Sequence, residues 1–214
     1  MQLTEILTAL STDPEQMSRG ILRIFHFIGL SLGMGAATLL DLMIFRFFLG
    51  KVMTEQSLEV FEFLADLVSV GLKLLWVTGL GFLLFYWLHD PVKLGNEKVW
   101  AKIVIVTILT VNGVFIHRTV IPFIRGQVGY RMLEGVALRR KMLFVTTGII
   151  SFTSWYGPLV IANLPQLNFQ VPMVQILVVY GLVLLLILTV AHFVLFGSEI
   201  ARFGRDQMRV RRHT

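Results

Sequence analysis

Three histidines lie inside long apolar runs of the sequence. They are His26 in "FHFIGLSLGMG", His117 in "VFIHR" and His192 in "VAHFVLF". Ionisable side chains at membrane depth are costly, and they mark functional sites by default. Neutral imidazole is the commonest side-chain ligand for metals, and haem b takes one or two such rings from facing helices. These three histidines therefore predict haem or metal ligation.

The histidines fall on two levels if each apolar run is a membrane-spanning helix. His26 lies about four residues into its run and Lys102 about three into another, which places both near one surface at about 1.5 Å per residue. His117 and His192 lie about eighteen and about twenty residues into their runs, near the opposite surface. We expect His117 and His192 to ligate one haem. We expect His26, with His89 or another group opposite it, to ligate a second haem or to line a quinone site.

Two further residues complete the predicted cofactor site. Arg118 directly follows His117 and can pair with a haem propionate, because guanidinium binds carboxylates bidentately. Trp155, in "SWYGP", is placed to line a cofactor pocket. The predicted metal ligands are His26, His117 and His192, and the predicted cofactor-binding residues are His26, Gly33, His89, Lys102, His117, Arg118, Trp155 and His192.

Glycines follow the first of these histidines closely. Gly29, Gly33 and Gly35 remove side chains from one stretch of the helix below His26. This gap can admit a flat macrocycle. The same pattern, small-xxx-small, is also the usual signature of two helices in close contact. Both interpretations stay open at this stage.

One carboxylate also lies inside an apolar run. Asp41 belongs to the level of His117, and Lys73 lies near the middle of its own run. Asp41 can form a structural ion pair with Lys73 or with Arg46.

The composition identifies the elements that must position these residues. The chain of 214 residues is 56% hydrophobic and 15% charged, with a mean hydropathy of +0.77. Five runs approach the roughly 20 apolar residues that cross a bilayer core as a helix. The sequence therefore predicts an all-α fold, a polytopic membrane bundle of five transmembrane helices in one domain, 1–214, with helices near residues 22–45, 64–88, 99–121, 142–163 and 172–196.

Basic residues predict the orientation of this bundle, because they concentrate in cytoplasmic loops. Thirteen of the 19 Lys and Arg residues fall on the side of the carboxyl terminus. We therefore expect an outer amino terminus, a basic cytoplasmic tail over 197–214 and a multi-pass protein of a bacterial inner membrane. Residues 1–20 are expected to form an interfacial amphipathic segment, in which "STDPEQ" starts a helix capped by Ser11 or Thr12, with Pro14 and Glu15 in its first turn.

Charge and cysteine content exclude several classes of function. The net charge of +6 is explained by topology and anionic lipid, and no nucleic-acid-binding module is visible. The absence of cysteine excludes disulfides, thiolate catalysis, iron–sulfur clusters and thiol-bound copper.

The sequence resembles the superfamily of small bacterial membrane proteins that includes CopD-like copper-resistance proteins and HemJ-type protoporphyrinogen oxidases. The resemblance covers roughly residues 20–120 and rests on His26 with its glycine-containing stretch, "TGLG" and Trp-x-Lys. It implies haem or metal chemistry in the membrane, with His26 as a ligand and Lys102 as a functional residue nearby. The matching positions are His26, Gly33, Thr78, Gly79, Trp100 and Lys102.

The chain departs from the HemJ type in two places. It reads "LLDLMIFRFF" where HemJ-type proteins continue helix 1 with a "YLPR"-like segment, and it has a fifth helix with its own histidine. Oxidation of protoporphyrinogen is therefore not transferred to this chain.

Three functions remain open from the sequence. The first is a b-type haem redox protein, an electron-transfer protein or oxidoreductase that works with a quinone or redox-protein partner. The second is a copper-handling or other metal-handling membrane protein or transporter that uses the same histidines. The third is a non-catalytic subunit of a larger complex. Homo-oligomerisation is compatible with each.

Overall fold

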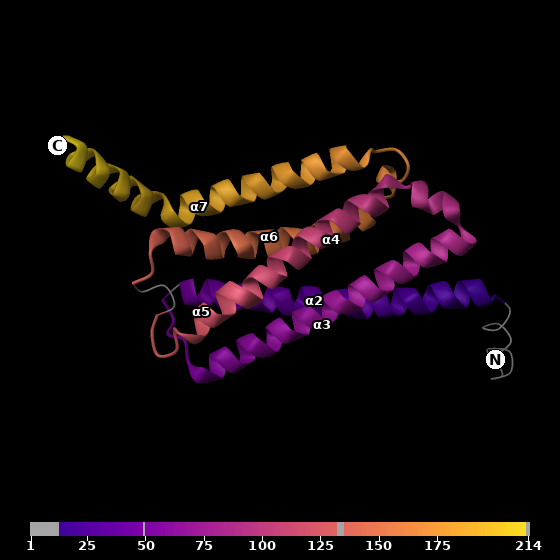
Figure 1. The fold of residues 1–214 in the computed structure, drawn as a ribbon, viewed down its shortest axis with the longest axis horizontal. Helices are drawn as coiled ribbons and strands as arrows, with labels where there is room; N and C mark the ends of the chain where they lie inside the picture. Colours follow the sequence, from indigo (N-terminus) through magenta and orange to yellow (C-terminus); the bar gives the residue numbers. More distant parts are fainter. Residues whose placement is uncertain (1–12, 49, 132–134, 213–214) are drawn as a thin grey trace.

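The computed structural model describes the backbone of residues 13–48, 50–131 and 135–212, and the side chains within these ranges up to Gly197 except that of Phe48. Within these ranges the named elements are all helical, and five helices are long and apolar enough to cross a membrane. The predicted five-helix membrane bundle is confirmed at this level. The start of the first described helix and the end of the last one lie at opposite ends of the bundle (Figure 1).

The long helices are joined by short helical turns. The long helices are α2 (Pro14–Phe48), α3 (Glu55–His89), α4 (Glu97–Phe115), α6 (Leu138–Ala162) and α7 (Met173–Arg212). The short elements are η1 (Pro91–Gly95), the π-helical turn η2 (Ile116–Val120), α5 (Ile121–Arg125) and η3 (Pro165–Leu167).

The helices extend beyond the predicted apolar runs. Helix α2 begins at Pro14 with Glu15 in its first turn, as predicted, but the cap is Asp13, whose Oδ1 accepts a hydrogen bond from Gln16 N at 3.0 Å. The predicted caps, Ser11 and Thr12, lie outside the described residues. Residues 14–20 of the predicted interfacial segment continue into α2 without a break.

The start of α3 shows why the sequence placed the beginning of this helix too late. Thr54 caps this helix by accepting a hydrogen bond from Ser57 N, and the helix runs from Glu55, well before residue 64. Hydropathy detects only the part of a helix that suits hydrocarbon. A capped helix can continue past that part with charged side chains.

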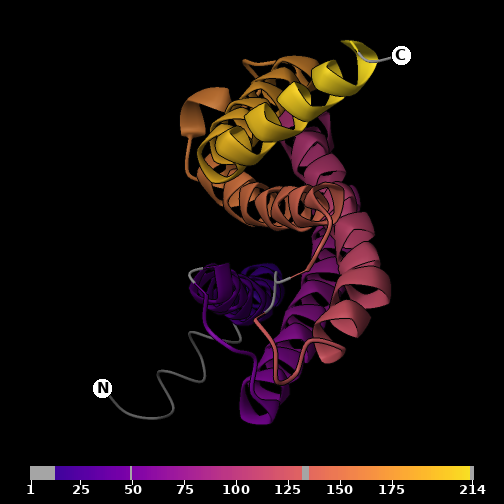
Figure 2. The same cartoon turned by 90° about the vertical axis from the view of Figure 1, so that its left-hand side faces the viewer.

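Helix α6 lies between α7 on one side and α2 on the other, and it also packs against α4 (Figure 2). Polar side chains join these neighbours inside the bundle, which favours association of helices in lipid. Hydrogen bonds of this kind that reach α6 include Thr38–Tyr156 at 3.0 Å, Asn112–Thr147 O at 3.0 Å and Ser154–Tyr180 at 2.7 Å. Another, Trp76–Thr110 at 2.9 Å, joins α3 to α4.

The amino-terminal end of α4 is tied to the end of α6 by one lysine. Lys98 is 5% exposed, and its Nζ donates to Ala162 O, Leu164 O and Asn168 Oδ1 at 3.3, 2.8 and 3.1 Å. A cation that satisfies the last carbonyls of a helix also interacts favourably with the helix dipole. Lys98 therefore has a structural role.

Helices α2 and α3 cross in backbone contact. A Cβ added to Gly71 would lie 2.4 Å from Gly33 N and 2.8 Å from Gly29 O. A Cβ added to Gly33 would lie 2.3 Å from Cη2 of Trp155 on α6. The glycine pattern thus serves close helix packing here, and the indole of Trp155 fills the space that Gly33 leaves.

Replacing Gly71 by alanine is expected to lower the stability of the bundle, because its methyl group has no room against the backbone of α2. Overpacking of this kind costs about 1–3 kcal/mol. The matched control is Gly79→Ala on the same helix, where nothing lies within 4 Å of the added Cβ. Thermal unfolding in detergent should show a lower midpoint for Gly71→Ala alone. Equal midpoints for the two variants would contradict the crossing.

Candidate functional site

The first predicted ligand, His26 on α2, is held by a hydroxyl on α3. Its Nδ1 lies 2.8 Å from Thr78 Oγ1, while Thr78 donates its own proton to Leu74 O at 2.7 Å. Thr78 Oγ1 therefore accepts from His26 Nδ1–H. The other ring nitrogen, Nε2, keeps its lone pair. Phe82 meets the imidazole edge to face, with ring centroids 5.6 Å apart.

Lys102 on α4 lies near His26, at the end of the bundle where depth in the sequence placed both residues. It is half-buried and close enough to His26 for the two side chains to interact electrostatically. Its ammonium forms no hydrogen bond or ion pair with another residue that the structure describes. An unpaired cation beside an unprotonated ring nitrogen can receive a ligand that carries a negative charge.

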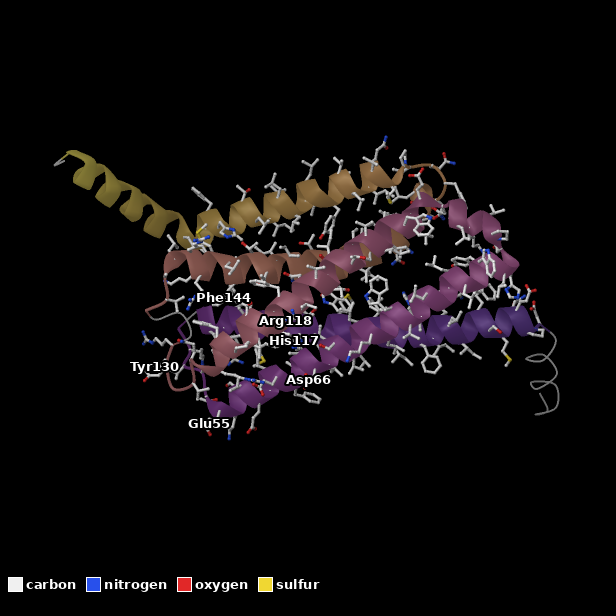
Figure 3. The ribbon with its side chains drawn as sticks, in the orientation of Figure 1. Glu55, Asp66, His117, Arg118, Tyr130 and Phe144 are labelled. Carbon is white, nitrogen blue, oxygen red and sulfur yellow. The ribbon has the colours of Figure 1, made fainter. Side chains whose placement is uncertain are left out.

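The second histidine, His117, is also held by a hydroxyl on α3, but through the opposite nitrogen. Its Nε2 lies 2.9 Å from Ser69 Oγ, and Ser69 donates to Ala65 O at 3.1 Å. Ser69 therefore accepts from Nε2–H, and Nδ1 of His117 keeps the lone pair. His117 lies in the π-helical turn η2, and π-bulges are frequent at functional sites (Figure 3).

The third histidine, His192, packs on a different helix. Its Nδ1 lies 2.8 Å from Leu188 O, and its Nε2 lies 3.3 Å from both Met142 O and Thr146 Oγ1. Thr146 donates its own proton to Met142 O at 2.9 Å. Both ring nitrogens of His192 thus face oxygen acceptors, and no lone pair is directed to open space.

The predicted inner pair is consequently divided between two neighbours, since His117 bonds to α3 and His192 bonds to α6. The sharing of one haem by these two rings stays a prediction. Arg118 is exposed on η2 beside His117.

His89 lies at the end of α3, apart from the interactions of His26. Its ring stacks on Phe85 with centroids 4.7 Å apart, and its Nε2 lies 3.9 Å from Glu15 Oε1. These contacts give His89 a packing role at the end of the bundle. The pairing of His89 with His26 across a cofactor stays a prediction.

A cavity lies between α2, α3, α6 and the junction of α4 with η2. Its polar lining includes Asp41, His117, Ser151 and Trp155. Trp155 is 2% exposed, and its Nε1 has no hydrogen-bond partner. Trp155 lines this cavity, and its predicted role in a cofactor pocket stays a prediction. Asp41 was recognised in the sequence only as an ion-pair candidate; no ion pair joins it to Lys73 or Arg46.

Sequence reasoning missed the anchoring role of α3. Ser69 and Thr78 lie nine residues apart on this helix, about 13.5 Å along its axis. A hydroxyl at the level of each histidine was a visible signal. It carries little weight alone, because Ser and Thr in apolar helices commonly bond to their own backbone.

The described residues contain no group of three or more His, Asp or Glu side chains that could hold a metal ion. No family model, curated protein or solved structure matches the chain. The resemblance to the CopD and HemJ types therefore stays a prediction, and the site must be interpreted from its own geometry.

The two anchored histidines should have opposite tautomers. With labelled histidine, the ¹⁵N shifts should identify His26 as the Nδ1–H form and His117 as the Nε2–H form. Thr78→Val removes the acceptor of Nδ1–H and should release the tautomer of His26 alone, while Thr78→Ser should preserve it. One common tautomer for both rings in the wild type would be incompatible with these hydrogen bonds.

Proposed function

We propose that the protein is a membrane-embedded b-type haem redox protein, with His26 as the axial ligand and with a quinone or a redox protein as electron partner. One observation carries this proposal. Thr78 holds Nδ1–H of His26, so that Nε2 is the free nitrogen. Metal-bound histidines almost always donate their other N–H to a second group, which fixes the tautomer and the ring orientation.

The residues around His26 fit such a group. The unpaired ammonium of Lys102 can neutralise a propionate, and the aromatic edge of Phe82 helps exclude water from the ring. When bound, haem supplies reversible one-electron chemistry. The residues of the chain supply ligation, orientation and charge balance.

Of the three predicted ligands, His26, His117 and His192, the proposal keeps only His26. His192 offers no free lone pair, because both of its nitrogens face oxygen acceptors. His117 keeps a lone pair at Nδ1, but a π-helical turn presents it at the surface of the bundle. Trp155 occupies the space left by Gly33. One haem per chain is therefore the stoichiometry that we propose.

We further propose that the amino-terminal end of the bundle faces outward and that the chain resides in a bacterial inner membrane. The support is the concentration of Lys and Arg near the opposite end, together with the uncharged connection "NLPQLNFQVP" between α6 and α7. The His26 site then lies toward the outer surface.

Reduced-minus-oxidised visible spectra test the haem proposal. Protein purified after expression with ample haem should show a b-type α-band. His26→Ala should abolish this band because it removes the ligand, whereas the matched variants His192→Ala and His89→Ala should retain it. A colourless wild-type protein, or a full band in His26→Ala, would contradict the assignment.

Labelling of single cysteines tests the orientation, since the chain has no cysteine of its own. Gln166→Cys on η3 should react with a membrane-impermeant maleimide in intact cells. Glu55→Cys at the start of α3 should react only after the membrane is opened. Both native residues are exposed, so accessibility within the fold is matched. The reverse pattern would overturn the proposed topology.

A further inference from the structure

The cavity beside Asp41, His117, Ser151 and Trp155 is separate from the proposed haem site at His26. It is enclosed by α2, α3 and α6 and by the α4–η2 junction, which contributes His117. His117 is itself exposed, so the cavity reaches the surface of the bundle at this turn. Asp66 on α3 and Arg118 on η2 are exposed at the same end (Figure 3).

Three polar side chains that line this cavity have no partner among the described residues. Trp155 is 2% exposed, and its Nε1 has nothing to donate to. Neither the hydroxyl of Ser151 nor the carboxyl of Asp41 forms a hydrogen bond or ion pair with a described residue. Inside a membrane protein, a buried polar group without a hydrogen-bond partner lowers the stability by roughly several kcal/mol. Trp155 Nε1–H is the buried group that bears this cost, while Ser151 and Asp41 are partly buried and face the same cavity. Polar molecules in the cavity would supply partners to all three groups.

The size of the cavity selects the occupant. The cavity has a volume of about 70 Å³. One water needs roughly 10–15 Å³, whereas an engineered cavity that takes a benzene ring measures about 150 Å³. The cavity therefore suits a small cluster of waters. An aromatic group such as the ring of a quinone is too large for it.

We propose that this cavity is a hydrated proton-binding site, in which Asp41 exchanges protons with a water cluster that also accepts from Trp155 Nε1–H and bonds to Ser151. A Cβ at Gly148 would lie 3.8 Å from Asp41 Oδ1, which places the carboxyl against α6, the helix that supplies Ser151 and Trp155. The cluster reaches the surface at His117, whose Nδ1 accepts a hydrogen bond from water.

No Lys or Arg among the described residues lines the cavity, so no permanent positive charge there balances the carboxylate of Asp41. Of the described residues that line the cavity, α2 contributes Asp41 and η2 contributes His117 as the only titratable side chains. The lining residues from α3, α4 and α6 are apolar, hydroxyl-bearing, glycine or tryptophan. Proton binding by Asp41 is therefore the available way to neutralise this site.

The exchange step conserves protons. Protonated Asp41 gives its proton to a neighbouring water, leaving a carboxylate and a hydronium, and the excess proton passes through the cluster to bulk water. The reverse sequence reprotonates Asp41. In D₂O the same exchange replaces Asp41–H by Asp41–D and releases HDO.

Infrared spectroscopy of the full-length protein in lipid nanodiscs tests this proposal. The carbonyl stretch of a protonated carboxylic acid should titrate between about pH 4 and pH 9, a range that spans carboxyl and imidazole titration. It should be absent in Asp41→Asn and should shift in D₂O within the time of buffer exchange. Ser151→Ala keeps the carboxyl but should displace the band, because one hydrogen bond to the cluster is lost.

The matched control is Asp66→Asn, which removes an exposed carboxyl of α3 and should leave the band unchanged. Three results would overturn the proposal: no Asp41 band over the titration, a band that fails to shift in D₂O, or a band removed by sodium but not by choline chloride. The last result would identify a cation site. If Asp41→Asn does not fold, displacement of the band in Ser151→Ala, which keeps the carboxyl, still assigns the band to this cavity, and an unmoved band in that variant would also overturn the proposal.

Discussion

The contact of the α2 and α3 backbones at Gly33 and Gly71 determines the geometry of the rest of the molecule. His26 lies seven residues before Gly33, and Thr78 lies seven residues after Gly71. In consecutive helices that run in opposite directions, both steps are about two turns toward the same end. The crossing therefore brings His26 and Thr78 to one level on facing surfaces. The hydrogen bond that leaves Nε2 of His26 free is a consequence of this packing.

The inner cavity depends on the same crossing. The indole of Trp155 on α6 packs against α2 at Gly33. Its N–H is buried there and has no hydrogen-bond partner among the described residues. Further along α2, Asp41 faces α6 at Gly148. One packing arrangement thus creates a histidine with a free nitrogen on one side of the crossing and a carboxyl beside unpaired polar groups on the other. The proposed haem site and the proposed proton site on the two sides of the crossing are compatible with redox chemistry that moves both electrons and protons.

Much of the fold was predictable, because composition and run length are strong signals in a membrane protein. The five helices and the shared level of His26 and Lys102 follow from these signals, and the first turn of α2 follows from the helix-start motif "STDPEQ". Rotation of a helix about its axis does not. His117 and His192 have similar depths, yet one bonds to Ser69 on α3 and the other packs on α6. The π-helical turn at His117 lies just before Pro122, which lacks the N–H that would bond to the carbonyl of residue 118. A proline in a helical run signals a disturbance of the helix but does not tell a π-helical turn from a kink or a helix end.

The haem proposal depends most directly on His26 as the ligand of the iron. Resonance Raman spectroscopy of the reduced protein, prepared with and without ¹⁵N-labelled histidine, tests it most directly. We predict an iron–histidine stretch that shifts on labelling and disappears in His26→Gly, and that returns when imidazole is added. Haem-containing protein whose iron–histidine band survives in His26→Gly without added imidazole would contradict it.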